Sequence, residues 1–139
     1  MVQIHFFYLF FMNSTLINFL IAIKNASIFK KELLKIFYNK KFILLSKTLY
    51  KQGLIQDFWL EKQNLHFKIV IALKYTYNFS NFKNFKIVSK PSRSLYFSSK
   101  DIFKLYEKQV LYIFSTSFGY LTSLECKQKK IGGILFFYV

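Results

Sequence analysis

The chain has 139 residues, of which 53% are hydrophobic, which is enough apolar material for one compact domain or two small lobes. Its 21 Lys and Arg residues against 6 Asp and Glu give a formal net charge of +15. Such an excess predicts a polyanionic partner, either nucleic acid bound with salt-sensitive affinity or an anionic membrane surface. The composition argues against a disordered chain.

Residues that carry catalytic or metal chemistry are sparse. Cys126 is the only cysteine, so neither an intrachain disulfide nor a cysteine-cluster metal site is expected. His5 and His66 stand outside any recognisable motif, and no Gly-rich phosphate loop ending in Lys-Ser/Thr occurs. We interpret the carboxylates of Asp57 and Glu61 as solvated or paired with lysines. The sequence therefore predicts no enzyme, no cofactor, no metal and no small-molecule substrate.

The amino end allows two interpretations. Residues 2–23 contain no Asp, Glu, Lys or Arg and are long enough to span a bilayer, so a basic membrane-associated protein anchored by this segment is the alternative function. Four polar residues would be costly in hydrocarbon: Asn13, Ser14, Thr15 and Asn18. No basic region precedes His5, as a signal peptide would require. We favour residues 1–13 as an extension ahead of a folded lobe.

Residues 14–76 are expected to form an amino-terminal α-β lobe. A first helix, capped by Asn13 or Ser14, is predicted over residues 14–25, because apolar residues recur there on one face. Residues 30–41 fit either a short strand or a distorted helix. Asn39 is expected to cap a second helix, which should end at Gly53 in the left-handed conformation.

An antiparallel hairpin follows, with strands over 54–60 and 65–75 joined by a turn at 61–64. The alternation along the second strand predicts a buried face that begins with Leu65 and Phe67. Residues 77–84 are the best candidate for a linker between two lobes.

Residues 85–139 are expected to form a carboxyl-terminal, mainly β lobe with one short helix. Strands are predicted over 85–89 and 110–115, and a helix over 99–108 that begins with a capping box of Ser98 and Asp101. A Ser-Thr-Ser-Phe-Gly turn at 115–119 and a Gly-Gly pair before the last strand suit contact with a phosphate–sugar backbone, although both are also ordinary turn chemistry. The predicted fold class is α/β (α+β) with two small lobes.

The order of these motifs resembles the family of small-subunit ribosomal protein eight from about Thr15 to Val139. The carboxyl end carries the most specific likeness, with Ser-Thr-Ser-Phe-Gly at 115–119 and Ile-Gly-Gly-Ile at 131–134. Shorter matches occur in the family's order: Ile-Lys-Asn-Ala at 23–26, Gly-Leu-Ile-Gln-Asp-Phe at 53–58, Leu-Lys-Tyr at 73–75 and Val-Ser-Lys-Pro at 88–91.

The resemblance implies a structural protein that binds the central domain of small-subunit ribosomal RNA early in assembly, beside neighbouring small-subunit ribosomal proteins. It implies that the main RNA contacts come from the carboxyl lobe. Carried over to this sequence, the expected RNA-binding residues are Ser115, Thr116, Ser117, Gly119, Gly132, Gly133, Lys90, Arg93, Tyr96, Lys24 and Asn25.

The sequence departs from the family pattern near the expected contacts. Phe118 stands where the family often has a basic residue, and we favour core packing over RNA stacking for its ring. Ser92 replaces the usual Gly, and Arg93 is displaced. The lysine-rich, Phe- and Tyr-rich composition indicates an AT-rich genome. Together with the lack of an Arg-rich import segment, it leads us to expect a mitochondrial small subunit, with plastid or AT-rich bacterial cytoplasm as alternatives.

Overall fold

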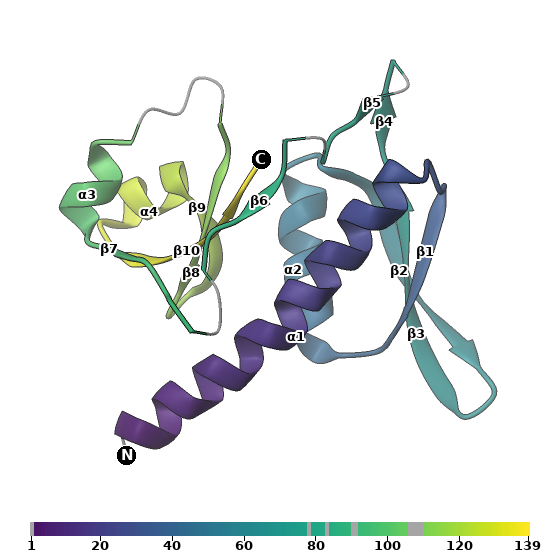
Figure 1. Ribbon diagram of the computed structural model, residues 1–139, viewed down its shortest axis with the longest axis horizontal. Coiled ribbons are helices and arrows are strands. Elements are labelled where there is room, and N and C mark those ends of the chain that lie inside the picture. Colours follow the sequence, from purple (N-terminus) through teal and green to yellow (C-terminus); the bar gives the residue numbers. More distant parts are fainter. Residues whose placement is uncertain (1, 78, 83, 90–91, 106–109) are drawn as a thin grey trace. The chain divides into compact units, whose positions relative to one another are not determined.

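The computed structural model describes residues 2–77, 79–82, 84–89, 92–105 and 110–139, which form a mixed α+β fold of two compact units (Figure 1). One unit holds residues 19–84, and the other holds residues 85–139 together with residues 1–18. The predicted fold class is confirmed. The roles of residues 1–13 as an extension and of 77–84 as a linker stay predictions.

Helix α1 spans Val2–Ile28, so the predicted start at Asn13 or Ser14 is wrong. No Pro or Gly interrupts this segment, and Asn, Ser and Thr cost only a fraction of a kcal/mol each inside a helix. In the unit of residues 19–84, α1 buries Leu20 and Ile23 completely. No helix among the described residues combines the length and apolarity that a bilayer span requires.

A three-stranded antiparallel sheet in the order β1-β3-β2 forms the other layer of this unit. Its strands are β1 (Leu33–Phe37), β2 (Ile55–Gln63) and β3 (His66–Leu73). Residues 30–41 therefore contain a strand, which pairs with β3 along its whole length. The central strand buries Ile69 and Ile71 completely, because it has a hydrogen-bonded neighbour on both sides and helices on one face.

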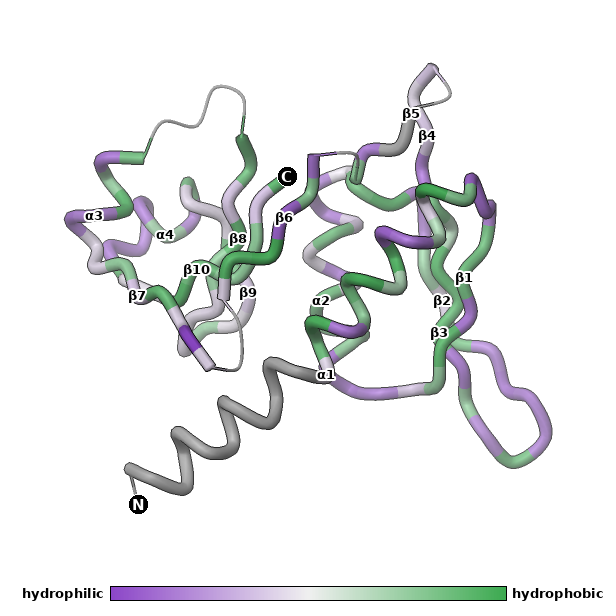
Figure 2. Tube along the Cα trace, in the orientation of Figure 1, coloured by the Kyte–Doolittle hydropathy of each residue, from purple (hydrophilic) through white to green (hydrophobic). Residues whose placement is uncertain are grey.

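The turn between β2 and β3 is shorter than predicted, and this difference exposes Leu65 to solvent. Gln63 pairs with His66, so only Asn64 and Leu65 form the turn, with Asn64 at a positive φ of 55°. Leu65 is consequently 90% exposed, and Phe67 is 49% exposed, so the expectation that the buried face begins with these two residues is wrong. Figure 2 shows mainly hydrophilic residues around this turn.

Helix α2 (Lys40–Lys51) begins and ends as its sequence predicts. The Asn39 side chain accepts a hydrogen bond from the Lys41 amide at 3.0 Å. Gly53 has a φ of 72°, and the amide of Leu54 donates to the Leu49 carbonyl at 2.9 Å, which closes the helix. A two-stranded ribbon of β4 (Tyr75–Thr76) and β5 (Phe79–Ser80) follows the main sheet.

The second unit is built on a sheet in the order β6-β10-β8-β9, with β7 also paired to β10. The strands are β6 (Lys86–Ile87), β7 (Tyr96–Phe97), β8 (Tyr112–Thr116), β9 (Gly119–Thr122) and β10 (Gly133–Tyr138). Helices α3 (Ser99–Phe103) and α4 (Ser123–Lys129) pack on one face of it. Their core is formed by Ile102, Phe114, Cys126 and Leu135.

Both helices of this unit begin with a capping box. The box of Ser98 and Asp101 is confirmed, but α3 ends at Phe103 and not at residue 108, and residues 106–109 lie outside the described chain. Helix α4 is absent from the predicted elements. Its start is marked by Thr122 and Glu125, whose side chains accept hydrogen bonds from each other's backbone amides at 3.3 and 3.0 Å.

Candidate RNA-binding surface

The Ser-Thr-Ser-Phe-Gly segment forms the tip of the β8–β9 hairpin. Thr116 pairs with Gly119, so the turn consists of Ser117 and Phe118 alone, and Ser115 lies inside β8. The hydroxyl of Thr116 donates to the Gly119 carbonyl at 2.8 Å and accepts from the Phe118 amide at 3.2 Å. Thr116 therefore holds the turn together, and the exposed Ser117 hydroxyl is left to face solvent.

Gly119 supplies the backbone geometry that this short turn needs. Its φ is 103°, a conformation that is strained for any residue with a Cβ. A Cβ built on Gly119 would meet no atom within 4 Å, so space is not what requires glycine at this position. Glycine is required for its backbone conformation, and this conformation fixes the direction in which the turn projects.

The Gly132-Gly133 pair lies where other parts of the same unit pass close by. A Cβ on Gly132 would lie 2.6 Å from the carbonyl oxygen of Phe97 and 2.7 Å from the Tyr96 hydroxyl. A Cβ on Gly133 would lie 2.7 Å from Cγ2 of Thr116. The lack of a Cβ at both glycines thus lets β7 and the β8–β9 hairpin approach the backbone of this segment closely.

Strand pairing places two of the predicted site residues on one face of this sheet. Ile134 of β10 pairs with Tyr96 on one side and with Ser115 on the other. Residues paired across a sheet project to the same face, and two strand spacings amount to roughly 10 Å. Leu135, the next residue along β10, joins the core under α3 and α4, so Tyr96 and Ser115 belong to the opposite face of the sheet. Tyr96 is 70% exposed there.

Phe118 lies at the hairpin tip and is 66% exposed, so the expectation that it packs in the core is wrong. A two-residue turn projects its side chains away from the sheet, and the core of this unit is filled by other residues. The Nζ atom of Lys129 from α4 lies 5.2 Å from the centre of the Phe118 ring. Lys129 was not among the predicted site residues, because the helix that positions it was not predicted.

The remaining predicted residues are more dispersed. Arg93 is exposed and precedes β7, whereas Lys90 lies outside the described residues. Lys24 is half-buried and Asn25 is exposed on α1, and both belong to the unit of residues 19–84. The structure thus brings together the hairpin tip, the glycine pair and Tyr96 within one unit, and assigns Lys24 and Asn25 to the other.

The electrostatics of the carboxyl-terminal unit do not favour acid–base or nucleophilic chemistry. Burial raises the pKa of the Cys126 thiol to about 11, with a further contribution from the Glu125 carboxylate. Burial also raises the pKa of Tyr120 to about 12. Both groups are therefore uncharged near neutral pH. Among the described residues, no three His, Cys, Asp or Glu side chains gather closely enough to hold a metal ion.

Comparison with known proteins identifies the class to which this fold and surface belong. A family model described as ribosomal protein S8 matches residues 14–139. The small ribosomal subunit protein uS8c of Marchantia polymorpha is 33% identical over 129 residues, covering 91% of this chain and 98% of that protein. The uS8 protein of Mesomycoplasma hyopneumoniae strain 7448 is 30% identical, covering 93% of this chain and 98% of that protein.

A third relative, the uS8c protein of Tetradesmus obliquus, is 34% identical over 131 residues, which cover 87% of this chain and 93% of that protein. These matches define a structural protein of the small ribosomal subunit, not an enzyme. The chain belongs to the ribosomal protein S8 family.

Proposed function

We propose that the chain binds the central domain of small-subunit ribosomal RNA through the β8–β9 hairpin tip and the adjoining sheet face opposite α3 and α4. The observation that carries the proposal is the exposed Phe118 ring with the Lys129 ammonium over it, next to the free Ser117 hydroxyl. Structured RNA is recognised mainly through its shape, its 2′-hydroxyls and its phosphates. A hydroxyl, a cation and an aromatic ring on one projecting turn suit these three groups.

Each residue has a role that follows from its position. Ser117 donates or accepts a hydrogen bond at a phosphate or a 2′-hydroxyl, and Lys129 neutralises a phosphate. Phe118 and Tyr96 offer exposed rings on which a base or ribose stacks. Ser115, Thr116, Gly119, Gly132 and Gly133 set the shape of this surface. Lys90, Arg93, Lys24 and Asn25 are proposed as further phosphate contacts.

Filter binding of the full chain to the central-domain RNA of its own ribosome, over a salt series, tests the proposal. A Ser117→Ala, Lys129→Gln variant is expected to lose specific binding at physiological salt. Lys62→Gln is the control, because Lys62 is exposed on the other unit and the substitution removes one positive charge too. Equal binding of all three proteins to any RNA would show only a generic basic surface and would contradict the proposal.

We further propose that the ribosome is organellar, and specifically mitochondrial. Lysine supplies every basic residue except Arg93, and 19 Phe and 10 Tyr occur in 139 residues, a composition that an AT-rich organelle genome produces. The similarity to uS8c and uS8 proteins supports a plastid or bacterial type of ribosome as the broader class. Sequencing the DNA that encodes the chain tests the finer statement, since a nuclear, plastid or bacterial locus would overturn it.

A further inference from the structure

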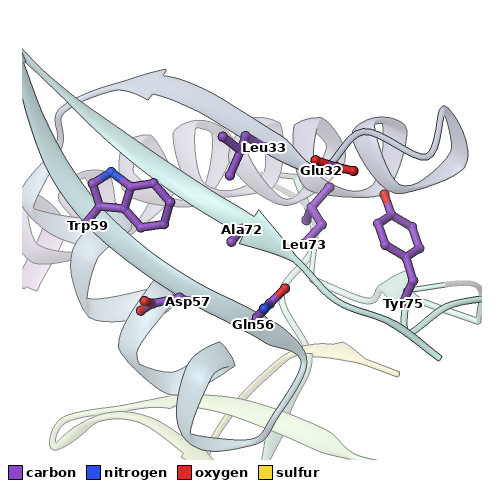
Figure 3. A pocket seen from close by; sticks show the side chains of 8 residues that line it. All are labelled: Glu32, Leu33, Gln56, Asp57, Trp59, Ala72, Leu73 and Tyr75. Carbon is purple, nitrogen blue, oxygen red and sulfur yellow. The ribbon is translucent and has the colours of Figure 1, made fainter.

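The sheet of the amino-terminal unit has one face that the helices leave uncovered. Three rows of paired residues cross it: Leu33, Ala72 and Asp57; Lys35, Val70 and Trp59; Phe37, Lys68 and Glu61. The alternate residues of the central strand, Ile69 and Ile71, point the other way. Like them, Val70 in the middle of the uncovered face is completely buried. Figure 3 looks onto the uncovered face, with the helices behind the sheet. We call these nine residues, together with Glu32, the acidic sheet face.

Large apolar side chains on this face are exposed to solvent. Leu33 is 46% exposed, Phe37 is 69% exposed and Trp59 is 42% exposed. An open cavity of about 530 Å³ lies over the sheet between Trp59 and Tyr75. Its wall includes Gln56, the extra residue of a bulge in β2 that turns both Gln56 and Asp57 toward the cavity. The face therefore offers apolar contact area and a recess.

Charge distinguishes this face from the rest of the protein. Three of the six acidic residues of a chain with a net charge of +15 lie on it: Glu32, Asp57 and Glu61. Glu61 is paired with Lys35 at 3.2 Å. Glu32 and Asp57 form no ion pair with any residue that the structure describes, and both border the cavity. Two lysines, Lys35 and Lys68, also lie on the face, and the Nζ atom of Lys68 lies 5.5 Å from the centre of the Phe37 ring. The carboxylates of Glu32 and Asp57 at the cavity are therefore the part of the face that would attract a cationic side chain.

We propose that the acidic sheet face binds a lysine- or arginine-rich segment of a neighbouring ribosomal protein. The proposal depends on the membership of this chain in the small subunit. Cationic side chains of that segment meet Glu32 and Asp57, and its apolar side chains cover Leu33 and Phe37. An arginine over Trp59 adds a cation–π contact, for which tryptophan is the best aromatic partner. RNA and a second copy of this chain are the occupants that the experiment must exclude.

Trp59 is the only tryptophan of the chain, so its fluorescence reports on this face alone. The probe is a short synthetic peptide of alternating arginine and leucine, titrated into the full-length protein. We expect the Trp59 emission to shift to shorter wavelength as the peptide covers the ring. A peptide with glutamate in place of arginine is the matched control and is expected to leave the emission unchanged.

A pair of variants with equal net charge separates local attraction from general repulsion. Glu32→Gln with Asp57→Asn removes both unpaired carboxylates and is expected to weaken peptide binding roughly fivefold. Asn84→Lys with Gln128→Lys raises the net charge by the same two units at exposed positions that do not belong to the face. This control is expected to bind the peptide within about twofold of the original protein.

Three results would overturn the inference: no emission shift with the arginine peptide, equal weakening in both variants, or a shift that central-domain RNA or protein concentration alone produces. RNA binding measured on the same samples distinguishes this failure from failure of the proposed function. The carboxylate variant is expected to bind RNA at least as tightly as the original, because it only loses negative charge.

Discussion

Lys129 at the end of α4 reaches back over Phe118 at the tip of the β8–β9 hairpin, with its Nζ atom 5.2 Å from the ring centre. Helix α4 begins directly after β9, so the hairpin and the cation that accompanies it belong to one continuous segment of chain. Because the ring is 66% exposed, the pair offers a stacking surface and a positive charge at the same point.

Replacement of this lysine should change the salt dependence of RNA binding in a defined way. If Lys129 neutralises one phosphate, Lys129→Gln lowers the slope of log affinity against log salt concentration by about 0.7 to 0.9. Filter binding at four or more salt concentrations measures the slope. Lys62→Gln should leave it unchanged, and an identical slope for Lys129→Gln would remove Lys129 from the interface.

Replacement of the aromatic ring tests stacking separately from charge. Phe118→Leu keeps an apolar side chain at the tip but removes the ring, and loss of a stacked base costs about 1 to 3 kcal/mol of binding free energy. The salt slope should stay constant while the affinity falls at every salt concentration. Phe103→Leu, another exposed ring in the same unit, provides the control. Equal affinities of the two variants would contradict stacking on Phe118.

The glycine pair should be needed for folding before it is needed for RNA. A Cβ at Gly133 would lie 2.7 Å from Cγ2 of Thr116 and 3.0 Å from the Ser115 carbonyl oxygen. Overpacking of this kind costs about 1 to 3 kcal/mol, so Gly133→Ala should lower the free energy of unfolding by that amount in urea titrations.

A second substitution checks the cause of that destabilisation. Thr116→Ser removes Cγ2 but keeps the hydroxyl that donates to the Gly119 carbonyl. In the background of Gly133→Ala it should therefore recover part of the lost stability. The two effects on the free energy of unfolding should be non-additive, as expected for residues in contact. Strict additivity would show that the methyl group of Thr116 is not the obstacle.

The sequence predicts the amino-terminal unit well wherever a local signal determines structure. Asn39 and Gly53 mark the ends of α2 by side-chain capping and by a left-handed backbone, which are properties of single residues. The strand β1 could not be predicted, because residues 30–41 suit two structures and only pairing with β3 favours one of them. Leu65 was misplaced because turn length depends on the register of β2 and β3.

The candidate site shows the same division between local signals and tertiary structure. The capping box of Thr122 and Glu125 was a local signal for α4, and its recognition would have led to Lys129. The exposure of Phe118 could not be read from its type, because an aromatic residue in an apolar chain is usually core. The joining of Tyr96 to Ser115 through Ile134 depends on strand order, which the sequence alone does not give.

Loss of the Thr122 cap of α4 should lower the stability of the protein measurably. Thr122→Ala removes the oxygen that accepts from the Glu125 amide at 3.3 Å, and loss of such a cap lowers stability by about 0.5 to 2 kcal/mol. Urea unfolding measures the effect, and Thr76→Ala, an exposed threonine of the other unit, serves as the control. Because α4 carries Lys129, RNA affinity should fall as well. Unchanged stability would mean that the capping box does not hold α4.

The buried thiol should make stability depend on pH in the alkaline range. The pKa of Cys126 is raised from its ordinary value of 9.0 to about 11, so between these values the unfolded chain loses a proton that the folded chain keeps. Stability is therefore complete below about pH 9 and falls as pH rises toward 11. Tyr120 also titrates at alkaline pH, so the quantity to follow is the difference in the free energy of unfolding between the original protein and Cys126→Ala. Urea unfolding at pH 8, 9, 10 and 11 measures it. As pH rises, the free energy of unfolding of the original protein should fall relative to that of Cys126→Ala. A difference that stays constant over this range would show that the thiol is not shielded from solvent.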